Sequence, residues 1–135
     1  MSTGNARAAA LATFGSLAIF YLGSVIFQLI SWGWSWTLES ARAEHALASS
    51  LALRIIGGLI SVAVFALCIG GPRWRKLRTY LAWVLALGVA IVVVIDNLSP
   101  QAETVASQAV VWLVAGGGVA VHVFGAIAAR RVALE

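Results

Sequence analysis

Four long apolar runs, separated by short polar segments, dominate the hydrophobic pattern of the chain. They cover about residues 8–32, 51–69, 79–95 and 104–129. Each run is close to or above the roughly 20 residues that a helix needs to cross the hydrocarbon core of a bilayer. A chain in lipid must satisfy its backbone hydrogen bonds within itself, and a single helix does so. The pattern therefore predicts an all-α fold, an integral membrane four-helix transmembrane bundle formed by residues 1–135 as one domain.

The composition supports this class over a soluble one. Of the 135 residues, 61% are hydrophobic and 10% are charged, and the mean hydropathy is +0.96. A soluble domain is about half apolar and about one quarter charged. So much apolar surface would leave a soluble protein with exposed patches that aggregate, and we expect the chain to lie in lipid.

The segment 70–78, here called the basic hinge, separates the second and third runs. Its Gly70, Gly71 and Pro72 predict the end of a helix, since glycine costs backbone entropy and proline cannot donate a hydrogen bond. Four basic residues follow within six positions: Arg73, Arg75, Lys76 and Arg78. Short basic loops stay on the cytoplasmic side during insertion. The hinge therefore predicts the orientation of the whole chain.

The other basic residues agree with this orientation. Seven of the nine lie on the side of the hinge and the termini, whereas Arg42 and Arg54 lie on the other. We expect cytoplasmic N- and C-termini in a multi-pass protein of the cell inner (plasma) membrane. The excess of arginine over lysine, with abundant Ala, Val and Gly, indicates a bacterial source.

The net charge of +4 also bears on partners. Because the basic residues flank apolar runs, we expect membrane lipids to be their partners, with anionic headgroups at Arg73, Arg75, Lys76 and Arg78. This interpretation leaves no role for nucleic acid.

Tryptophans mark the predicted membrane boundaries. Trp32, Trp34 and Trp36 follow the first run, and Trp74 lies in the basic hinge. Indole rings sit well at the headgroup level, which predicts interfacial anchors. The alternative is an aromatic platform for a sugar or base, since alternate residues of an extended segment point to one side.

Four polar residues within the runs or at their ends are candidates for chemistry: Gln28, Arg54, Asp96 and His122, with Tyr21 near the middle of the first run. Arg54 lies 18 residues before Pro72, and Asp96 lies 18 residues after Arg78. Their equal distances from the hinge predict similar depths and an ion pair between the second and third helices. The alternatives are a charged vestibule for an ion, proton or substrate, and an Arg54 that reaches the headgroups.

His122 is the deepest ionisable residue of the fourth run. Such a histidine can shuttle protons or bind a metal or haem iron. A haem bundle usually offers two axial ligands, however, and the other histidine, His45, lies in a polar connection. We expect His122 to be a neutral residue packed against a neighbouring helix, with a proton path as the alternative.

Small residues predict where helices approach closely. Gly57 and Ser61 form a small-xxx-small pair in the second run, and Gly116, Gly117 and Gly118 stand together in the fourth. Because short side chains allow close contact in membranes, we predict helix packing at both places.

Catalytic patterns are missing from the sequence. The lone Cys68 excludes an intrachain disulfide and thiol-rich metal sites. There is no nucleophile–base pattern, zinc-protease motif or phosphate-binding glycine loop, and the first run lacks the acidic residue of a small four-span drug exporter. We expect no enzyme, no cofactor and no metal.

Two functional hypotheses remain. The first is a non-enzymatic accessory or scaffold subunit, which packs with itself or with a larger membrane assembly. The second is a minimal transporter or channel for an ion, proton or small molecule, working as a homo-oligomer with Gln28, Arg54, Asp96 and His122 along its path.

Overall fold

The computed structural model describes residues 3–43, 51–98 and 105–132, and these form four long helices and no strand. They are α1 (Thr3–Ala43), α2 (Leu51–Ile69), α3 (Arg75–Leu98) and α4 (Val105–Val132), with a short 3-10 helix η2 (Pro72–Trp74) before α3. Within the described ranges, each of the four long helices holds a stretch long and apolar enough to cross a membrane. The predicted all-α four-helix fold is confirmed.

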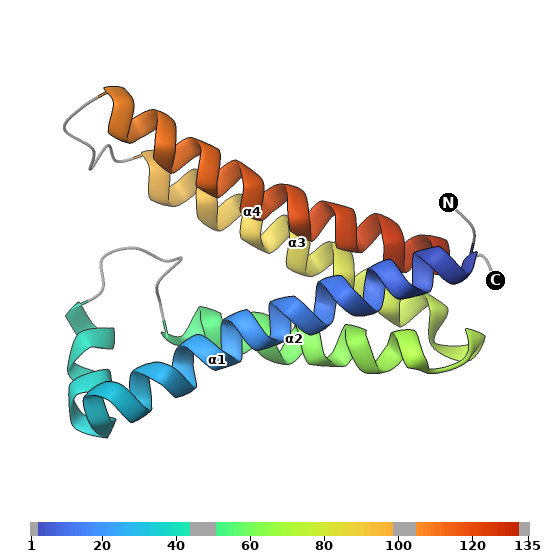
Figure 1. The fold of residues 1–135 in the computed structure, drawn as a ribbon, viewed down its shortest axis with the longest axis horizontal. Coiled ribbons are helices and arrows are strands. Elements are labelled where there is room, and N and C mark those ends of the chain that lie inside the picture. The colour runs from blue at the N-terminus through green and yellow to red at the C-terminus, as the bar shows by residue number, and fades with distance from the viewer. Residues whose placement is uncertain (1–2, 44–50, 99–104, 133–135) are drawn as a thin grey trace.

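The helices run up and down in sequence order. α1 packs against α2 and α4, and α3 packs against α4 and α2. The basic hinge and both ends of the chain lie at the same end of the bundle, which we call the basic end (Figure 1). At the opposite end, called the open end, the α1–α2 pair and the α3–α4 pair stand apart (Figure 1).

The apolar core lies mainly in the half of the bundle next to the basic end. Phe14, Val64 and Cys68 are fully buried there. Around them, buried alanines come from three helices: Ala6, Ala10, Ala82, Ala86, Ala126 and Ala129. Since an alanine side chain is only a methyl group, the helix backbones approach closely and gain dispersion contacts along their length.

Two glycines mark the closest helix contacts. A Cβ on Gly58 would lie 2.5 Å from the Leu22 side chain of α1, and one on Gly125 would lie 2.8 Å from Thr13 Cγ2. Gly57 and Ser61 are both buried, and a Cβ on Gly57 would lie 3.3 Å from the Tyr21 ring of α1. Their role in helix packing stays a prediction.

Gly116, Gly117 and Gly118 do not pack against another helix within the described part of this chain. They are exposed, and a Cβ on any of them would meet no described atom within 4 Å. They lie on the open-end side of His122 along α4, and their predicted role in helix packing stays a prediction. The glycine of α4 that another helix contacts is Gly125, one turn nearer the basic end than His122.

α1 bends sharply at Gly33, whose φ of 74° and ψ of 171° are non-helical. This left-handed φ favours glycine, because a Cβ would be strained there. Beyond the bend the chain is helical again, to Ala43, and turns away from the first part of α1 (Figure 1). The backbone after Trp32 is therefore not extended, and a platform of three rings on one side is not formed by strand spacing. The side chains of Trp32, Trp34 and Trp36 lie outside the described part of the structure.

The basic hinge closes the end of α2. The Gly70 N–H donates to the Ala66 carbonyl over 3.1 Å, and the Trp74 N–H donates to the Gly71 carbonyl over 3.4 Å. Arg78 then reaches back from α3, and its guanidinium donates to the Leu67 carbonyl over 2.9 Å. The last carbonyls of a helix lack partners within the helix, and a cation there also interacts favourably with the helix dipole. Arg78 therefore caps α2.

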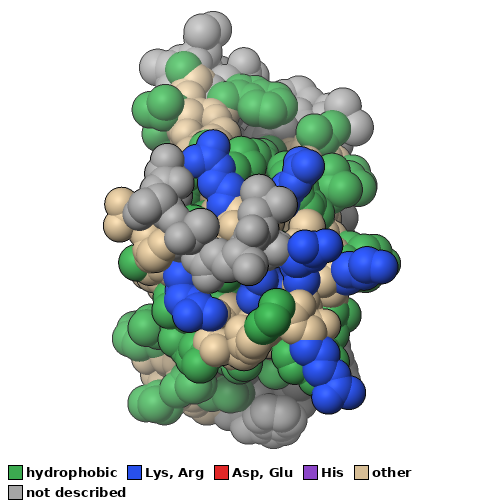
Figure 2. Space-filling model, turned by 90° about the vertical axis from the view of Figure 1, so that its right-hand side faces the viewer, with side chains coloured by type: hydrophobic (Ala, Val, Ile, Leu, Met, Phe, Trp, Pro, Cys, Tyr) green, Lys and Arg blue, Asp and Glu red, His purple; other side chains and the backbone are tan. Residues whose placement is uncertain are grey.

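This position corrects the prediction for Arg78. Its side chain is only 1% exposed, so it does not present its charge to lipid headgroups. Arg73, Arg75 and Lys76 are exposed instead. Lys and Arg side chains gather on the basic end (Figure 2).

Trp74 lies on the same surface. Its ring is 44% exposed, and Arg73 Cζ lies 5.4 Å from the ring centroid. A cation over an indole face is held by the ring quadrupole. This pair keeps a tryptophan at the surface of the basic end, which is the place expected of an interfacial anchor.

We expect Arg78→Ala to lower the free energy of unfolding in detergent by about 3 kcal/mol. The change leaves a cavity in the alanine-rich core and removes a charged donor from the partly buried Leu67 carbonyl, and each effect costs about 1–3 kcal/mol. Lys76→Ala, on the exposed side of the same segment, is the matched control and should stay within about 0.5 kcal/mol. Equal losses in the two variants would show that Arg78 does not cap α2.

Candidate functional site

One face of α1 carries the polar side chains of the bundle interior. Nearer the basic end this face is apolar, with the buried Phe14 and Leu17. It then continues through Tyr21, Ser24 and Gln28 at intervals of three and four residues. Residues with this spacing lie on the same side of a helix. The same face of α1 therefore changes from apolar to polar between the basic end and the open end.

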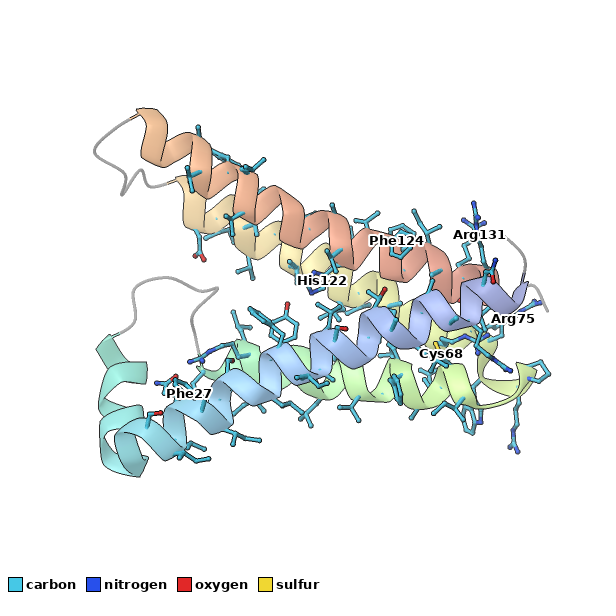
Figure 3. All side chains as sticks on the ribbon, in the orientation of Figure 1. Phe27, Cys68, Arg75, His122, Phe124 and Arg131 are labelled. Carbon is cyan, nitrogen blue, oxygen red and sulfur yellow. The ribbon has the colours of Figure 1, made fainter. Side chains whose placement is uncertain are left out.

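His122 joins this face from α4. Its Nε2 lies 2.8 Å from the Tyr21 hydroxyl, and its Nδ1 lies 2.7 Å from the Gly118 carbonyl of its own helix. The ring lies between α4 and α1 (Figure 3) and is only 5% exposed. A carbonyl only accepts, so Nδ1 carries a hydrogen, and in a neutral ring Nε2 accepts the Tyr21 O–H. Both ring nitrogens are then satisfied by the protein.

Arg54 joins the same face from α2. One guanidinium nitrogen donates to Gln28 Oε1 over 2.6 Å, and the other donates to Ser24 Oγ over 3.4 Å. The Ser24 hydroxyl itself donates to the Tyr21 carbonyl over 2.7 Å. Both side-chain partners from α1 are neutral. They join the guanidinium of α2 to α1.

The structure separates the predicted site residues into groups. Gln28 and Arg54 are brought together, and His122 is bonded one to two turns away at Tyr21. Asp96 lies half-buried near the end of α3. The hydrogen bonds described for Arg54 run to α1, and its ion pair with Asp96 stays a prediction.

A pocket of about 260 Å³ lies beside this polar face, between α2 and α3. Arg54 and Tyr21 line it together with apolar residues and two glycines, Gly57 and Gly88. Asp96 and His122 are not among the residues that line it. Arg54, Asp96 and His122 therefore do not converge on this pocket.

Metal chemistry finds no support in the described ranges. They contain no group of three His, Cys, Asp or Glu side chains placed to hold a metal ion. Cys68 is buried in the apolar core (Figure 3).

Sequence reasoning missed two contributors. Ser24 was not singled out, although its spacing from Tyr21 and Gln28 places all three on one helix face. Arg78 was assigned to the lipid surface, and its position four residues after Trp74 carries no signal that it folds inward. A search for polar residues at helical spacing would have found the first but not the second.

Comparisons with protein families, curated proteins and solved structures found no match to this chain. Its functional assignment therefore rests on the geometry of the residues described above.

We expect Arg54 and Gln28 to be energetically coupled. In a double-mutant cycle with Arg54→Leu and Gln28→Leu, the coupling should be about 1–2 kcal/mol, because a short charged hydrogen bond links two helices. The measurement is the free energy of unfolding in detergent for both single variants and the double variant. Additive losses would contradict the contact.

A second cycle in the same detergent tests the predicted ion pair. It combines Arg54→Leu with Asp96→Asn. If the charges pair, their coupling should exceed about 0.5 kcal/mol. A coupling near zero between Arg54 and Asp96, together with a clear coupling between Arg54 and Gln28, would show that Arg54 and Asp96 do not form an ion pair.

Proposed function

We propose that this chain is a non-enzymatic accessory or scaffold subunit, which assembles with itself or with a larger membrane complex. The observation that carries the proposal is the set of hydrogen bonds by which intramembrane side chains join one helix to another. His122 uses both ring nitrogens within the protein, and Arg54 joins α2 to Gln28 and Ser24 of α1. Such bonds join helices in lipid, where no solvent competes for them.

A transport path needs polar groups that meet water or a substrate along the membrane. The pocket beside Arg54 is lined mainly by valine, isoleucine and leucine, and Tyr21 is its other polar residue. His122, the buried polar residue of α4 that bonds to Tyr21, does not line it. This arrangement favours a structural role for the polar groups over a conducting one.

The surface of α4 near the open end supports an assembly role. Its Val110, Trp112, Leu113 and Val114 are 52–76% exposed, and the three exposed glycines, Gly116–Gly118, follow directly. Glycine is about 1 kcal/mol less favourable than alanine within a helix. Membrane helices accept that cost where a second helix approaches closely. We propose this surface of α4 as the place where another subunit packs.

The proposal includes a location. We place the protein in the inner membrane of a bacterium, with its basic end in the cytoplasm. Support comes from the clustering of Arg7, Arg73, Arg75, Lys76, Arg130 and Arg131 at that end, since cytoplasmic loops carry the excess of basic residues.

The first experiment measures flux. Vesicles that contain the purified protein should be as tight to protons and small ions as empty vesicles between pH 5.5 and 8. His122→Ala should leave that tightness unchanged, while it lowers the thermal stability in detergent because the bond between α1 and α4 is lost. Tyr21→Phe, which removes only the hydroxyl of the same bond, is the matched control and should lower the stability in the same direction.

A measurable flux whose pH profile depends on His122 would replace the scaffold with the transporter hypothesis. The assembly part is tested in the same vesicles by counting bleaching steps of a single fluorophore per chain. More than one chain per spot at high lipid excess is expected for self-assembly. If every spot held a single chain, self-assembly would be excluded. The partner would then have to be a different membrane protein.

The second experiment tests the orientation. In a Cys68→Ala background, cysteines placed at Ser40 and Ser99 should react in intact cells with a thiol reagent that does not cross membranes. A cysteine at Arg75, on the exposed surface of the basic end, should react only after the cells are opened. Labelling at Arg75 in intact cells would reverse the proposed orientation.

A further inference from the structure

A second groove, of about 590 Å³, lies between α1 and α4. Its lining includes Ala12, Ser16 and Phe20 of α1, and Ala120 and Phe124 of α4. These five residues are all exposed, so the groove opens toward the surrounding lipid rather than toward the bundle interior. Among the described residues that line it, none is charged. The groove therefore suits an apolar occupant that lies within the membrane.

Large and small side chains alternate along both walls of the groove. On α1, Ala12 and Ser16 precede Phe20 at intervals of four residues, and on α4 Ala120 precedes Phe124 at the same interval. This spacing places each set on one face of its helix. Phe20 is 68% exposed and Phe124 is 47% exposed. Each wall therefore has a shallow part next to one projecting ring.

The ring of α1 lies at the level of small residues of α4. A Cβ on Gly125 would lie 2.8 Å from Thr13 Cγ2, so these two positions are at one level. Because the two helices are antiparallel, seven residues forward from Thr13 correspond to seven residues back from Gly125. Phe20 therefore lies at a level between Gly117 and Ala120, which are both exposed.

The ring of α4 in turn lies at the level of small residues of α1. Phe124 precedes Gly125 by one residue, which places it one residue beyond Thr13 along α1. This level falls between Ala12 and Ser16. The two walls therefore have reciprocal profiles, because one helix is large at the levels where the other is small.

We propose that this groove is the interface with a second copy of this chain, related to the first by a two-fold axis along the membrane normal. The inference rests on the proposed assembly role and names the partner. Rotation about such an axis keeps every residue at its level and places α1 of one copy opposite α4 of the other. Phe20 then packs on Gly117 and Ala120 of the partner subunit. Phe124 packs on Ala12 and Ser16 of the partner subunit.

The orientation of the two copies agrees with this symmetry. Both copies carry the same basic end, and basic residues set the direction in which a chain is inserted. The two copies therefore stand parallel, as a two-fold axis along the membrane normal requires. A flexible lipid chain would fit a groove of any profile, whereas reciprocal profiles at matched levels fit a rigid partner with the same profile.

The exposed surface is large enough for a dimer. At about 200 Å² for a fully exposed phenylalanine, the exposed fractions of Phe20 and Phe124 amount to roughly 230 Å² per copy. The same face of α4 adds the exposed Leu113, Val121 and Ile127. With the small residues between them, the surface reaches roughly 600 Å² per copy, and two copies reach the lower end of stable interfaces, about 1,200 Å². Since lipid is itself apolar, close packing of such reciprocal surfaces drives the association.

The first experiment is cross-linking between two differently tagged chains in one membrane, both with Cys68→Ala. One chain carries Phe20→Cys and the other carries Ala120→Cys. A disulfide needs the two Cα atoms to lie within about 7 Å, so oxidation should join the two tags. Two controls, Phe20→Cys on both chains and Leu87→Cys on both chains, should give at least fivefold less product. The first control places both cysteines on α1, and α1 of one copy faces α4 of the other; the second uses an exposed residue of α3.

The second experiment exchanges the large and small positions. Ala120→Phe sets a second ring against Phe20 of the partner subunit, and the dissociation constant of the dimer should rise about tenfold or more. Adding Phe20→Ala to Ala120→Phe restores the alternation and should return the constant to within about threefold of the original. Ala66→Phe, at an exposed alanine of α2 outside the groove, is the matched control and should leave it unchanged. The constant is measured by counting bleaching steps in vesicles over a range of protein-to-lipid ratios.

The outcomes separate this interface from the broader assembly role. Dimers that do not cross-link between Phe20→Cys and Ala120→Cys, or an exchange that restores nothing, would overturn the interface and leave the assembly role standing. Single chains at every ratio would also overturn it, and the accessory role would then need a different membrane protein. Cross-linking together with a His122-dependent flux would support the interface and remove the scaffold function. Helicity and monodispersity are measured for every variant, and cross-linking decides the outcome if Ala120→Phe does not fold.

Discussion

Lipid provides no hydrogen-bond partners, and this constraint makes one face of α1 the centre of the bundle. The polar residues Tyr21, Ser24 and Gln28 of that face need partners from other helices. Arg54 supplies them from α2 and His122 supplies one from α4. Each bond fixes how a helix is rotated about its own axis. Packing between apolar side chains, which resemble the surrounding lipid, specifies that rotation only weakly. α1 therefore sets both its own orientation and that of its two neighbours.

The two ends of the bundle are held by different forces. At the basic end, alanines and Gly125 let the backbones of α1, α3 and α4 come close, and Arg78 caps the end of α2. At the open end the helix pairs separate (Figure 1), and directional bonds at Arg54 replace close packing. Stability within a protein follows the local density of such contacts. The open end is thus the part of the structure where a ligand or another subunit can be accommodated at the least cost.

The length of the apolar runs was enough to predict the helices, because a helix that crosses a bilayer must be long and apolar wherever it lies in the bundle. The turn at Gly70, Gly71 and Pro72 followed from backbone chemistry alone. The rotation of each helix could not be derived in the same way. Equal distances from the hinge place Arg54 and Asp96 at one depth but do not show which way either side chain faces, and Arg54 turns to Gln28. Gly116–Gly118 and Gly125 look alike in the sequence, yet within the described residues a Cβ would meet another helix at Gly125 and not at the other three.

Two arginines of this chain show why position within the fold, rather than residue type, decides what a charge does. Arg78 is 1% exposed and donates to a backbone carbonyl at the end of α2. Its guanidinium is therefore not accessible to a ligand. Arg54 is half-buried and donates to Gln28 and Ser24, so that it joins α2 to α1. The exposed basic residues of the hinge meet water and salt, which weaken their attraction for any single partner. The same residue type therefore caps a helix end at Arg78, joins two helices at Arg54 and lies exposed at the basic hinge.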